Sequence, residues 1–357
     1  MRKRIVLGAG QCGMKLAHNY YHEFKNADYE LLALSTSTED SVGIPKTSLI
    51  QVATEGSGKR FSSGSSIWDR NKEKLDRLFE GVIDTDIIYF TSAGGGSGSS
   101  SIPYVAEQTL RLGQNNRIFL VLVLPFGYEA LPFKPNALRS LSSLQAEGLL
   151  DKMSILLFDN DKLSKQYFDI ERSNPDKPVN LTNLEKINQH IISSTSMVLD
   201  LIRVYHDPNK FSPFTIDEIE HDSVIFSNGF IGVDSRKFDG AVTVKFDYGK
   251  LTDAKNVIIA KAVGLGESQY TMDQTTGIFL ENVRKISRRA KNARIMYGMI
   301  RTDKIDSGTY IIIGNNLDVV KYVSKIKSKI ELNVQEYLRH ESREKLLTRS
   351  ESRFLDI

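Results

Sequence analysis

The chain has 357 residues, of which 40% are hydrophobic and 25% charged, as is usual for a globular protein of two or three domains. Its net charge of +3 gives no whole-chain sign of nucleic-acid binding. The single cysteine, Cys12, excludes an internal disulfide framework and fits a reducing cytoplasm. The longest apolar run, IFLVLVLPF, is far shorter than the roughly 20 residues of a membrane helix, so no membrane partner is expected.

Strand and helix patterns alternate along the first half of the chain. Apolar runs predict strands at Arg4–Leu7, Glu30–Leu34, Ser48–Val52, Ile87–Phe90, Ile118–Leu124 and Ser154–Phe158. Helical spacing predicts helices at Met14–Phe24, Ser66–Phe79, Tyr104–Leu112 and Ala137–Leu149. This order predicts an α/β fold with an open, doubly wound, mostly parallel sheet, whose ligands bind at the carboxyl ends of the strands.

The second half begins with a long helix, because apolar residues recur every three or four positions over Asn183–Tyr205. From about Phe238 the pattern predicts a smaller α+β domain, followed by a last helix at Leu317–Leu338 and a charged tail from Arg339. We therefore divide the chain into an α/β domain at 1–182, the long central helix at 183–205, a loop with the α+β domain at 206–316, and a C-terminal helix and tail at 317–357.

Glycine-rich turns follow three of the predicted strands: GAGQCG at 8–13, EGSGK at 55–59 and AGGGSGSS at 93–100. Glycine lets the backbone approach a phosphate closely, and consecutive N–H groups beside a helix N-terminus form a cradle for an anion. Three such turns at neighbouring strand ends predict a site for a di- or triphosphate.

A dinucleotide-binding site is the alternative, because Gly8, Gly10 and Gly13 fit the G-x-G-x-x-G pattern. That site requires an acidic residue at the end of the second strand, where Ser35 stands, and it leaves the second glycine run unexplained. A dinucleotide-dependent enzyme on a Rossmann sheet therefore stays open as a function of a different class.

The stretch AGGGSGSS resembles the signature loop of the tubulin/FtsZ superfamily of GTPases, and AGQCG is similar to the first phosphate loop of tubulins. LPFGYEA and LLFDNDKL are similar to two further FtsZ segments, and the order of elements matches over roughly residues 4–315. The chain is identified as a member of this superfamily. Its long last helix and short charged tail are most like the plasmid- and phage-encoded TubZ branch.

The resemblance implies a site for GTP or GDP, with Gln11 near the phosphates and near a Mg²⁺ ion held mainly through phosphate and water, and with no protein side chain as a metal ligand. It implies that Glu129 belongs to the pocket, and that Asn160, Leu184 and Asn188 lie at the guanine base. Ser100 replaces the last glycine of the signature loop, and Phe133, followed by Lys134, stands where FtsZ has an arginine. The implied phosphate-binding residues are Gly10, Gln11, Cys12, Gly13, Gly56, Gly58, Gly94, Gly95, Gly96, Ser97 and Gly98.

The resemblance also places Asp217 and Glu220 on the catalytic acids of the loop after the long helix. These acids would polarise the water that attacks the γ-phosphate bound by the next subunit, so that hydrolysis depends on assembly. Head-to-tail contacts do not close, so filaments are expected. Taken in isolation, the two acids indicate only a solvated turn and the start of a helix.

The role implied by the TubZ resemblance is the segregation or positioning of plasmid or phage DNA in the cytoplasm of a bacterium or a phage-infected host. A cell-division ring is the alternative within the superfamily. The expected partners are further copies of the chain and a DNA-binding adaptor protein held by the C-terminal tail. Arg284–Lys304 holds eight basic residues and one acid, but we expect no direct contact with nucleic acid.

Overall fold

The computed structural model describes residues 2–24, 28–40, 43–126, 129, 133–167, 181–207, 209–210, 212, 214–238, 241–318, 321–332, 334–335 and 339. The charged tail beyond Arg339 therefore lies outside the described residues. The first half contains all six predicted strands, with helices between most of them. Its elements are β1 (Lys3–Ala9), α1 (Gly10–Phe24), β2 (Tyr29–Ser35), β3 (Leu49–Gln51), α2 (Phe61–Arg70), α3 (Lys72–Phe79), β4 (Thr85–Ser92), α4 (Gly96–Leu112), β5 (Arg117–Leu124), α5 (Phe133–Ala146), β6 (Ser154–Asp159) and α6 (Asn160–Tyr167).

Among its described residues, the second half contains the long helix, three further labelled α-helices and four further strands. Residues 321–332 are helical as well. The elements are α7 (Leu181–Leu199), α8 (Leu201–Tyr205), α9 (Glu218–Ile225), β7 (Gly229–Arg236), the 3₁₀ turn η1 (Leu251–Asp253), β8 (Asn256–Val263), α10 (Gln269–Arg289), β9 (Arg294–Arg301) and β10 (Tyr310–Leu317).

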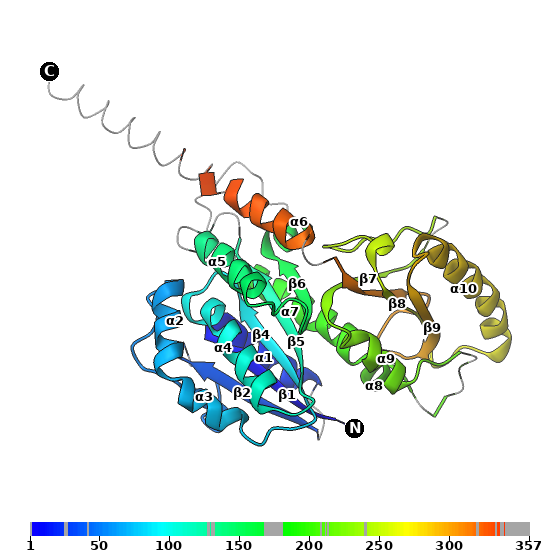
Figure 1. Cartoon of the computed structure of the whole chain (residues 1–357). Coiled ribbons are helices and arrows are strands. Elements are labelled where there is room, and N and C mark those ends of the chain that lie inside the picture. Colours follow the sequence, from blue (N-terminus) through cyan, green and yellow to red (C-terminus); the bar gives the residue numbers. More distant parts are fainter. Residues whose placement is uncertain are drawn as a thin grey trace.

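Among the described residues, ten strands form one sheet in the order β3-β2-β1-β4-β5-β6-β7-β10-β8-β9 (Figure 1). All neighbouring strands from β3 to β7 are parallel, β10 is antiparallel to both β7 and β8, and β8 is parallel to β9. The predicted doubly wound, mostly parallel sheet is confirmed. Because β1 to β6 are parallel, the loops that follow them all lie at one edge of the sheet.

Two apolar layers cover the sheet, one on each face. Side chains alternate between them along a strand, so Leu7 and Tyr89 belong to one layer, and Val6 and Phe90 to the other. The first layer is completed by α2 to α5, α10 and the helical residues 321–332. The second is completed by α1, α7, α8 and α9. Burial on both faces explains why the strands of the first half are apolar throughout.

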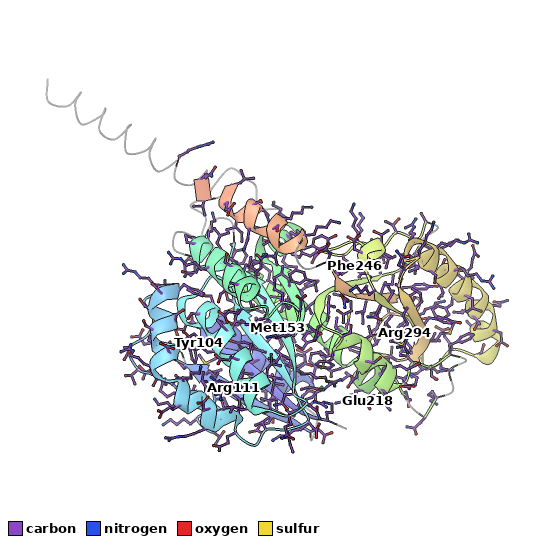
Figure 2. All side chains as sticks on the ribbon, viewed as in Figure 1. Tyr104, Arg111, Met153, Glu218, Phe246 and Arg294 are labelled. Atoms are coloured by element: carbon purple, nitrogen blue, oxygen red, sulfur yellow. The ribbon has the colours of Figure 1, made fainter. Side chains whose placement is uncertain are left out.

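The strands of the predicted α+β region extend the sheet of the first half. β6 pairs with β7 between Ser154 and Gly229, and the carbonyl of Met153 accepts a hydrogen bond from the Gly229 N–H at 2.9 Å. Met153 lies near the middle of the molecule in Figure 2. The domain boundaries at 182 and 206 stay predictions, but the strands on either side of them belong to one sheet.

Several predicted helix limits are wrong. α4 begins at Gly96 instead of Tyr104, with Pro103 inside the helix, and the carbonyl of Ser99, which cannot bond Pro103, accepts from Ser140 Oγ at 3.4 Å. The predicted helix at Ser66–Phe79 is divided at Asn71 into α2 and α3. The long helix is interrupted at Asp200, and Leu317 ends β10 instead of starting the last helix.

The last helix connects the second half to the end of β6. Tyr322 donates a hydrogen bond to Asp253 at 2.7 Å, and Lys329 forms an ion pair with Asp159 at 2.7 Å. Tyr248 also donates to Asp159, at 2.7 Å. Burial alone would raise the pKa of Asp159, but these two hydrogen bonds outweigh it and hold the pKa below its usual range. Asp159, which directly precedes Asn160, is therefore held by Tyr248 and by Lys329 of the last helix.

Candidate functional site

The first and last glycine-rich turns meet at the carboxyl ends of β1 and β4. A Cβ atom on Gly10 would lie 2.8 Å from the backbone nitrogen of Gly98, and one on Gly98 would lie 2.9 Å from the carbonyl oxygen of Ala9. Gly10 also has a φ of +68°, which other residues rarely adopt. Because α1 begins at Gly10 and α4 at Gly96, two helix N-termini are brought together at this edge. The structure thus unites two of the three turns in one cradle.

The third turn is joined to the cradle by hydroxyl groups. Gly56 and Gly58 have φ values of +65° and +55°, and the serine between them, Ser57, accepts a hydrogen bond from Ser97 Oγ at 3.1 Å. Ser97 is also hydrogen-bonded to Thr36, which follows β2. A chain of three hydroxyls therefore links the ends of β2, β3 and β4. Thr36 and Ser57 were missed in the sequence, although Ser57 lies inside EGSGK.

Asn136 on α5 holds two of the glycine turns together, and nothing in its local sequence pointed to it. Its side-chain amide donates to the carbonyls of Lys59 at 2.8 Å and Gly94 at 2.9 Å. Its side-chain oxygen accepts from the Phe61 N–H at 3.1 Å. Asn136 is 1% exposed, so these bonds are shielded from water. The loop after β3 and the loop after β4 thus keep their spacing through one buried amide.

Gly95 is the part of the Gly94–Gly98 run that faces open space. It is half-buried while its neighbours are buried, and a Cβ atom on it would meet no atom within 4 Å. The adjoining first turn of α4 carries N–H groups without partners inside the helix, at the positive end of the helix dipole. Gln11 and Lys15 are exposed on the first turns of α1. The exposed surface of the cradle can therefore donate hydrogen bonds to an anion.

The serine that replaces the last glycine of the signature loop is accommodated by α2. Ser100 Oγ donates to the carbonyl of Gly96 at 2.7 Å, and it lies so close to Gly64 that a Cβ atom on Gly64 would overlap it. The departure at Ser100 is thus matched by a glycine on the facing helix. Ser100 is fully buried, so this difference lies behind the cradle and leaves its surface unchanged.

Glu129 lies beside the first turn of α1. Its carboxylate accepts a hydrogen bond from the Phe126 N–H at 2.7 Å. Burial raises the pKa of Glu129, and the hydrogen bond from Phe126 only partly opposes this. Burial and the negative charge of Glu129 together raise the pKa of Cys12 to about 12, so this thiol is protonated and unreactive at neutral pH. The structure therefore brings two predicted pocket residues close to each other.

The residues predicted at the base come from two helices that pack together, α6 and α7. Asn160 is the first residue of α6, and its buried side-chain oxygen has no hydrogen-bond partner among the described residues. Leu184 and Asn188 lie one turn apart on α7 and are both partly buried. Unpaired amide groups of this kind can serve as donors and acceptors for a base.

Asp217 and Glu220 lie far from the cradle, on α9. Asp217 is the N-cap of this helix, and its carboxylate accepts from the Glu220 N–H at 2.7 Å. The Glu220 carboxylate makes no hydrogen bond or ion pair within the described part of the chain. Asp222 of α9 lies 3.5 Å from Arg4, the second residue of β1. The acids therefore lie at the amino-end edge of the sheet and the glycine turns at the opposite edge.

The basic run Arg284–Lys304 does not form one continuous surface. Arg301 is buried, and it donates to the carbonyls of Leu265 at 3.0 Å and Glu267 at 3.1 Å. Arg288 and Arg289 are exposed in the last turn of α10, where cations favour the negative end of the helix dipole. In the described ranges, no helix combines the length and apolarity that a membrane span requires.

Comparison with known proteins adds independent findings. Tubulin-like protein CetZ of Pyrococcus horikoshii is 29% identical over 219 residues, which cover 57% of this chain and 54% of that protein. CetZ of Methanothrix thermoacetophila is 28% identical over 188 residues, which cover 46% and 50%. This chain thus spans about half the length of the curated relatives it matches.

The fold is shared with solved structures of several branches. The GTPγS-form protofilament of TubZ from Bacillus thuringiensis serovar israelensis has a TM-score of 0.71 and 17% identity, covering 97% of this chain and 94% of that one. The GTPγS-bound protofilament of CetZ2 from Haloferax volcanii has a TM-score of 0.67 and 17% identity, covering 94% and 99%. The TubZ branch is therefore one of several that this chain resembles.

A model of the family described as "Tubulin/FtsZ family, GTPase domain" matches residues 3–168. These residues run from β1 to the end of α6, and they include all three glycine turns. Ser35, buried at the end of β2, occupies the place where a dinucleotide site would need a carboxylate. Residues 3–168 thus form a domain of the tubulin/FtsZ family.

Proposed function

We propose that this chain binds GTP in the cradle of glycine turns and hydrolyses it when a second copy docks head-to-tail. The observation that carries the proposal is the placement of its two halves at opposite edges of one sheet. β1 has 7 residues, and at roughly 3.3 Å per residue its two ends are about 20 Å apart. Asp217 and Glu220 therefore cannot reach a phosphate in their own cradle, and we propose that they act on one held by a neighbouring subunit.

The cradle would hold the phosphates through backbone groups. The N–H groups at the first turns of α1 and α4 and the open side of Gly95 face the space where the phosphates would lie. Such fixed donors also stabilise the negative charge that develops on a transferred phosphoryl group. Glu129 would accept a hydrogen bond from the ribose, and Asn160 and Asn188 would pair with the edge of the guanine.

A Mg²⁺ ion fits this arrangement through oxygen ligands. Mg²⁺ keeps several waters and prefers phosphate and side-chain oxygens. The amide of Gln11 is exposed on the first turn of α1, and the hydroxyls of Thr36 and Ser97 lie between the loops after β2 and β4. Gln11 would hold the ion through water, and the ion would supply positive charge at the γ-phosphate.

The acids would act on the water at the subunit contact. Asp217 is exposed and Glu220 is half-buried with an unpaired carboxylate, so both are available to a docked neighbour. Ile219, one of the two residues between them in the first turn of α9, is 83% exposed. A carboxylate pair beside an exposed apolar side chain suits a surface that both docks and orients water.

The cellular role that we propose rests on the resemblance to the TubZ branch. Filaments that segregate or position plasmid or phage DNA are proposed, with an adaptor protein bound by the tail beyond Arg339, in the cytoplasm of the host. A division ring is the alternative role for the same polymer. Deletion of residues 339–357 should leave GTP hydrolysis intact, because the tail follows the last packed helical turns.

The test is a measurement of phosphate release and of sedimentable polymer against protein concentration, with GTP, GDP or NADH added to the whole chain. We expect the rate per subunit to rise with concentration, and polymer to form with GTP. A rate per subunit that stays constant would contradict the shared site. Co-purification of a nicotinamide dinucleotide would favour the Rossmann-type enzyme instead.

A further inference from the structure

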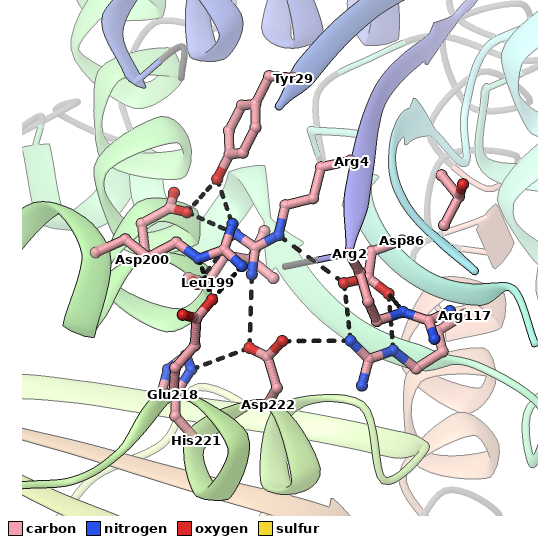
Figure 3. A network of polar contacts seen from close by, with 12 residues as sticks. Arg2, Arg4, Tyr29, Asp86, Arg117, Leu199, Asp200, Glu218, His221 and Asp222 are labelled. Atoms are coloured by element: carbon pink, nitrogen blue, oxygen red, sulfur yellow. Dashed lines mark hydrogen bonds and ion pairs between the residues drawn. The ribbon is translucent and has the colours of Figure 1, made fainter. Parts of the chain in front are cut away.

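Figure 3 shows a largely buried network of ionic contacts. Its strand residues lie at the amino ends of β1, β4 and β5, at the edge of the sheet opposite the glycine turns. It consists of Arg4 on β1, Asp86 on β4, Arg117 on β5, Asp200 between α7 and α8, and Asp222 on α9; we call these five residues the Arg4 network. The side chains of Arg4, Asp86 and Asp200 are 0% exposed.

Arg4 is the centre of the network. Its Nη1 lies 2.8 Å from Asp200 Oδ1, its Nη2 lies 3.5 Å from Asp222 Oδ1, and its Nε lies 3.9 Å from Asp86 Oδ2. Tyr20 and Tyr29 both donate hydrogen bonds to Asp200. One guanidinium thus connects a central strand to the end of the long helix and to α9.

Arg117 provides a second connection to α9. It binds both oxygens of Asp86, at 2.7 and 2.8 Å, and it reaches Asp222 Oδ2 at 3.3 Å. Its guanidinium also lies 4.0 Å from the centre of the Phe226 ring, just after α9. Asp222 is therefore held by two arginines from two different strands. Burial alone would raise the pKa of Asp222, but the hydrogen bond from His221 and these two positive charges hold it below its usual range.

Buried charges are expensive to desolvate, and apolar residues of similar size often stabilise a fold equally well. The better-attested advantage of such a network is that it allows one arrangement and excludes others. Here the arrangement is that of a short helix, because α9 has only 8 residues and few of them are buried. α9 makes a further ionic contact through Glu218, which accepts a hydrogen bond from Arg203 of α8 at 2.6 Å. Glu218 lies one helical turn from Asp222.

The inner and outer faces of α9 are related by helix geometry. Asp222 follows Glu220 by two residues, which corresponds to a rotation of about 200° around the helix axis. Fixing Asp222 toward the sheet therefore directs Glu220 away from it. Glu218 and Asp222 are four residues apart and share the inner face. The two ionic contacts thus determine both the position of α9 and the direction of its outer carboxylate.

We propose that Arg4, Arg117 and Asp222 are positioning residues for GTP hydrolysis, which orient Glu220 and Asp217 toward the phosphates bound by the next copy of the chain. This inference rests on the proposed function. The network is anchored on the strands whose carboxyl ends lead into the site: Gly10 directly follows β1, the Gly94–Gly98 turn follows β4, and Glu129 follows β5. Each subunit thereby holds its cradle and its acids in a constant relation through the same strands.

The first experiment compares Asp222→Asn with Asp84→Asn, using the whole chain. Asp84 pairs with Arg2 at 3.6 Å at the same edge, but it is largely exposed and does not contact α9. Asp222→Asn should bind GTP as a monomer within about twofold of wild type and should still polymerise. Its kcat should fall by roughly 10- to 100-fold with little change in KM, because small displacements of a catalytic group have effects of this size. Asp84→Asn should behave as wild type.

Mixing variants separates orientation from general damage. Asp222→Asn supplies an intact cradle, and Gly95→Ala, once its loss of GTP binding is verified, supplies intact acids. Their mixture should recover activity at contacts that combine the two intact halves. A mixture of Asp222→Asn with Glu220→Gln should not recover, since both lack the same half.

The inference is wrong if Asp222→Asn hydrolyses GTP at the rate of Asp84→Asn, or if its GTP affinity falls together with its kcat and mixing restores nothing. Should Asp222→Asn fail to fold, Arg117→Lys, which keeps the charge but loses the two-pronged bond to Asp86, undergoes the same assays and the same criteria. If Glu220→Gln itself hydrolyses at the wild-type rate, the proposed role of the acids fails, and that outcome is distinct from a failure of the network.

Discussion

Gly10 and Gly98 lie in direct backbone contact, since a Cβ atom on Gly10 would lie only 2.8 Å from the backbone nitrogen of Gly98. The loops after β1 and β4 are therefore packed against each other without any side chain between them. A cradle built in this way is already formed by protein contacts alone, and its glycines serve two purposes. Some give room to the protein backbone, and others give room to a ligand.

Gly95→Ala and Gly96→Ala should separate these purposes. A Cβ atom on Gly96 would lie 2.7 Å from the Arg60 nitrogen, so Gly96→Ala should lower both Tm and GTP affinity. Gly95 has a φ of −69° and free space around it, so Gly95→Ala should keep its Tm within about 1 °C and lose GTP binding at least tenfold. Thermal denaturation and nucleotide titration measure both effects. Unchanged GTP affinity in Gly95→Ala would contradict the proposal that the phosphates bind at this loop.

Asp217→Asn and Glu220→Gln test the acids. Asparagine is as good an N-cap as aspartate, so Asp217→Asn should keep α9 intact, whereas Asp217→Ala should cost about 1 kcal/mol of folding free energy. Both charge-removing variants should bind GTP normally as monomers and hydrolyse it roughly 10²- to 10⁴-fold more slowly. Their polymers should persist in sedimentation assays after wild-type polymer has disappeared. If both variants hydrolyse GTP at the wild-type rate, Asp217 and Glu220 have no catalytic role and serve only the structure of α9.

Glu129→Gln should stabilise the free protein while weakening GTP binding. The folded-state pKa of Glu129 is raised above the ordinary value of 4.5, so ionised Glu129 opposes folding at neutral pH, and this penalty vanishes when the pH falls below 4.5. The Tm of Glu129→Gln should therefore exceed that of wild type at pH 7 and equal it at pH 4.5 and below.

The matched ligand for Glu129 is 2′,3′-dideoxy-GTP, which lacks the ribose hydroxyls. A hydrogen bond to a carboxylate is stronger than one to an amide, so we expect Glu129→Gln to lose about tenfold in affinity for GTP. The affinity for the dideoxy analogue should be nearly the same in Glu129→Gln as in the wild type. Equal losses for both nucleotides would place Glu129 away from the ribose.

Ile219→Lys should impair assembly without affecting the fold. Ile219 is 83% exposed in the isolated chain, so the substitution removes no core contact. If a neighbour covers Ile219, its burial contributes roughly 1.5–3 kcal/mol, and the critical concentration for polymer should rise at least tenfold. Ile219→Leu is the matched control and should polymerise normally. A critical concentration that is unchanged in Ile219→Lys would place the contact elsewhere.

Asn136→Ala should loosen the cradle from behind. It leaves the partly buried Phe61 N–H and the carbonyls of Lys59 and Gly94 without their side-chain partner, and an unsatisfied group that is shielded from water costs roughly 1–3 kcal/mol. We expect denaturant titrations to report a stability loss of at least about 2 kcal/mol, together with weaker GTP binding. Asn292→Ala removes an exposed asparagine and should change neither. Equal stability of the two variants would contradict the role given to Asn136.

Much of the fold could be read locally. All six strands of the first half were predicted, because strands buried on both faces are apolar throughout, and the glycine turns were predicted as a phosphate site because they directly follow strands. The errors arose where tertiary contacts outweigh local preference. α4 continues through Pro103 because Ser140 of α5 donates a hydrogen bond to the Ser99 carbonyl, which the proline cannot bond. The long helix is interrupted at Asp200, whose carboxylate is bound by Arg4 and two tyrosines.

The sequence by itself determined which strands form, which turns are rich in glycine, and which chemical groups the chain can offer, because strand periodicity and glycine content are properties of neighbouring residues. Only the tertiary structure decided that Gly10 meets Gly98, that Asn136 joins two loops, and that Asp222 is held by Arg4 and Arg117. These contacts join residues far apart in the chain, and they follow from the order of the strands and the packing of helices on both faces. The separation of Asp217 and Glu220 from the cradle also follows from the tertiary structure. The glycine turns lie at the carboxyl ends of the parallel strands, and α9 packs at their amino ends.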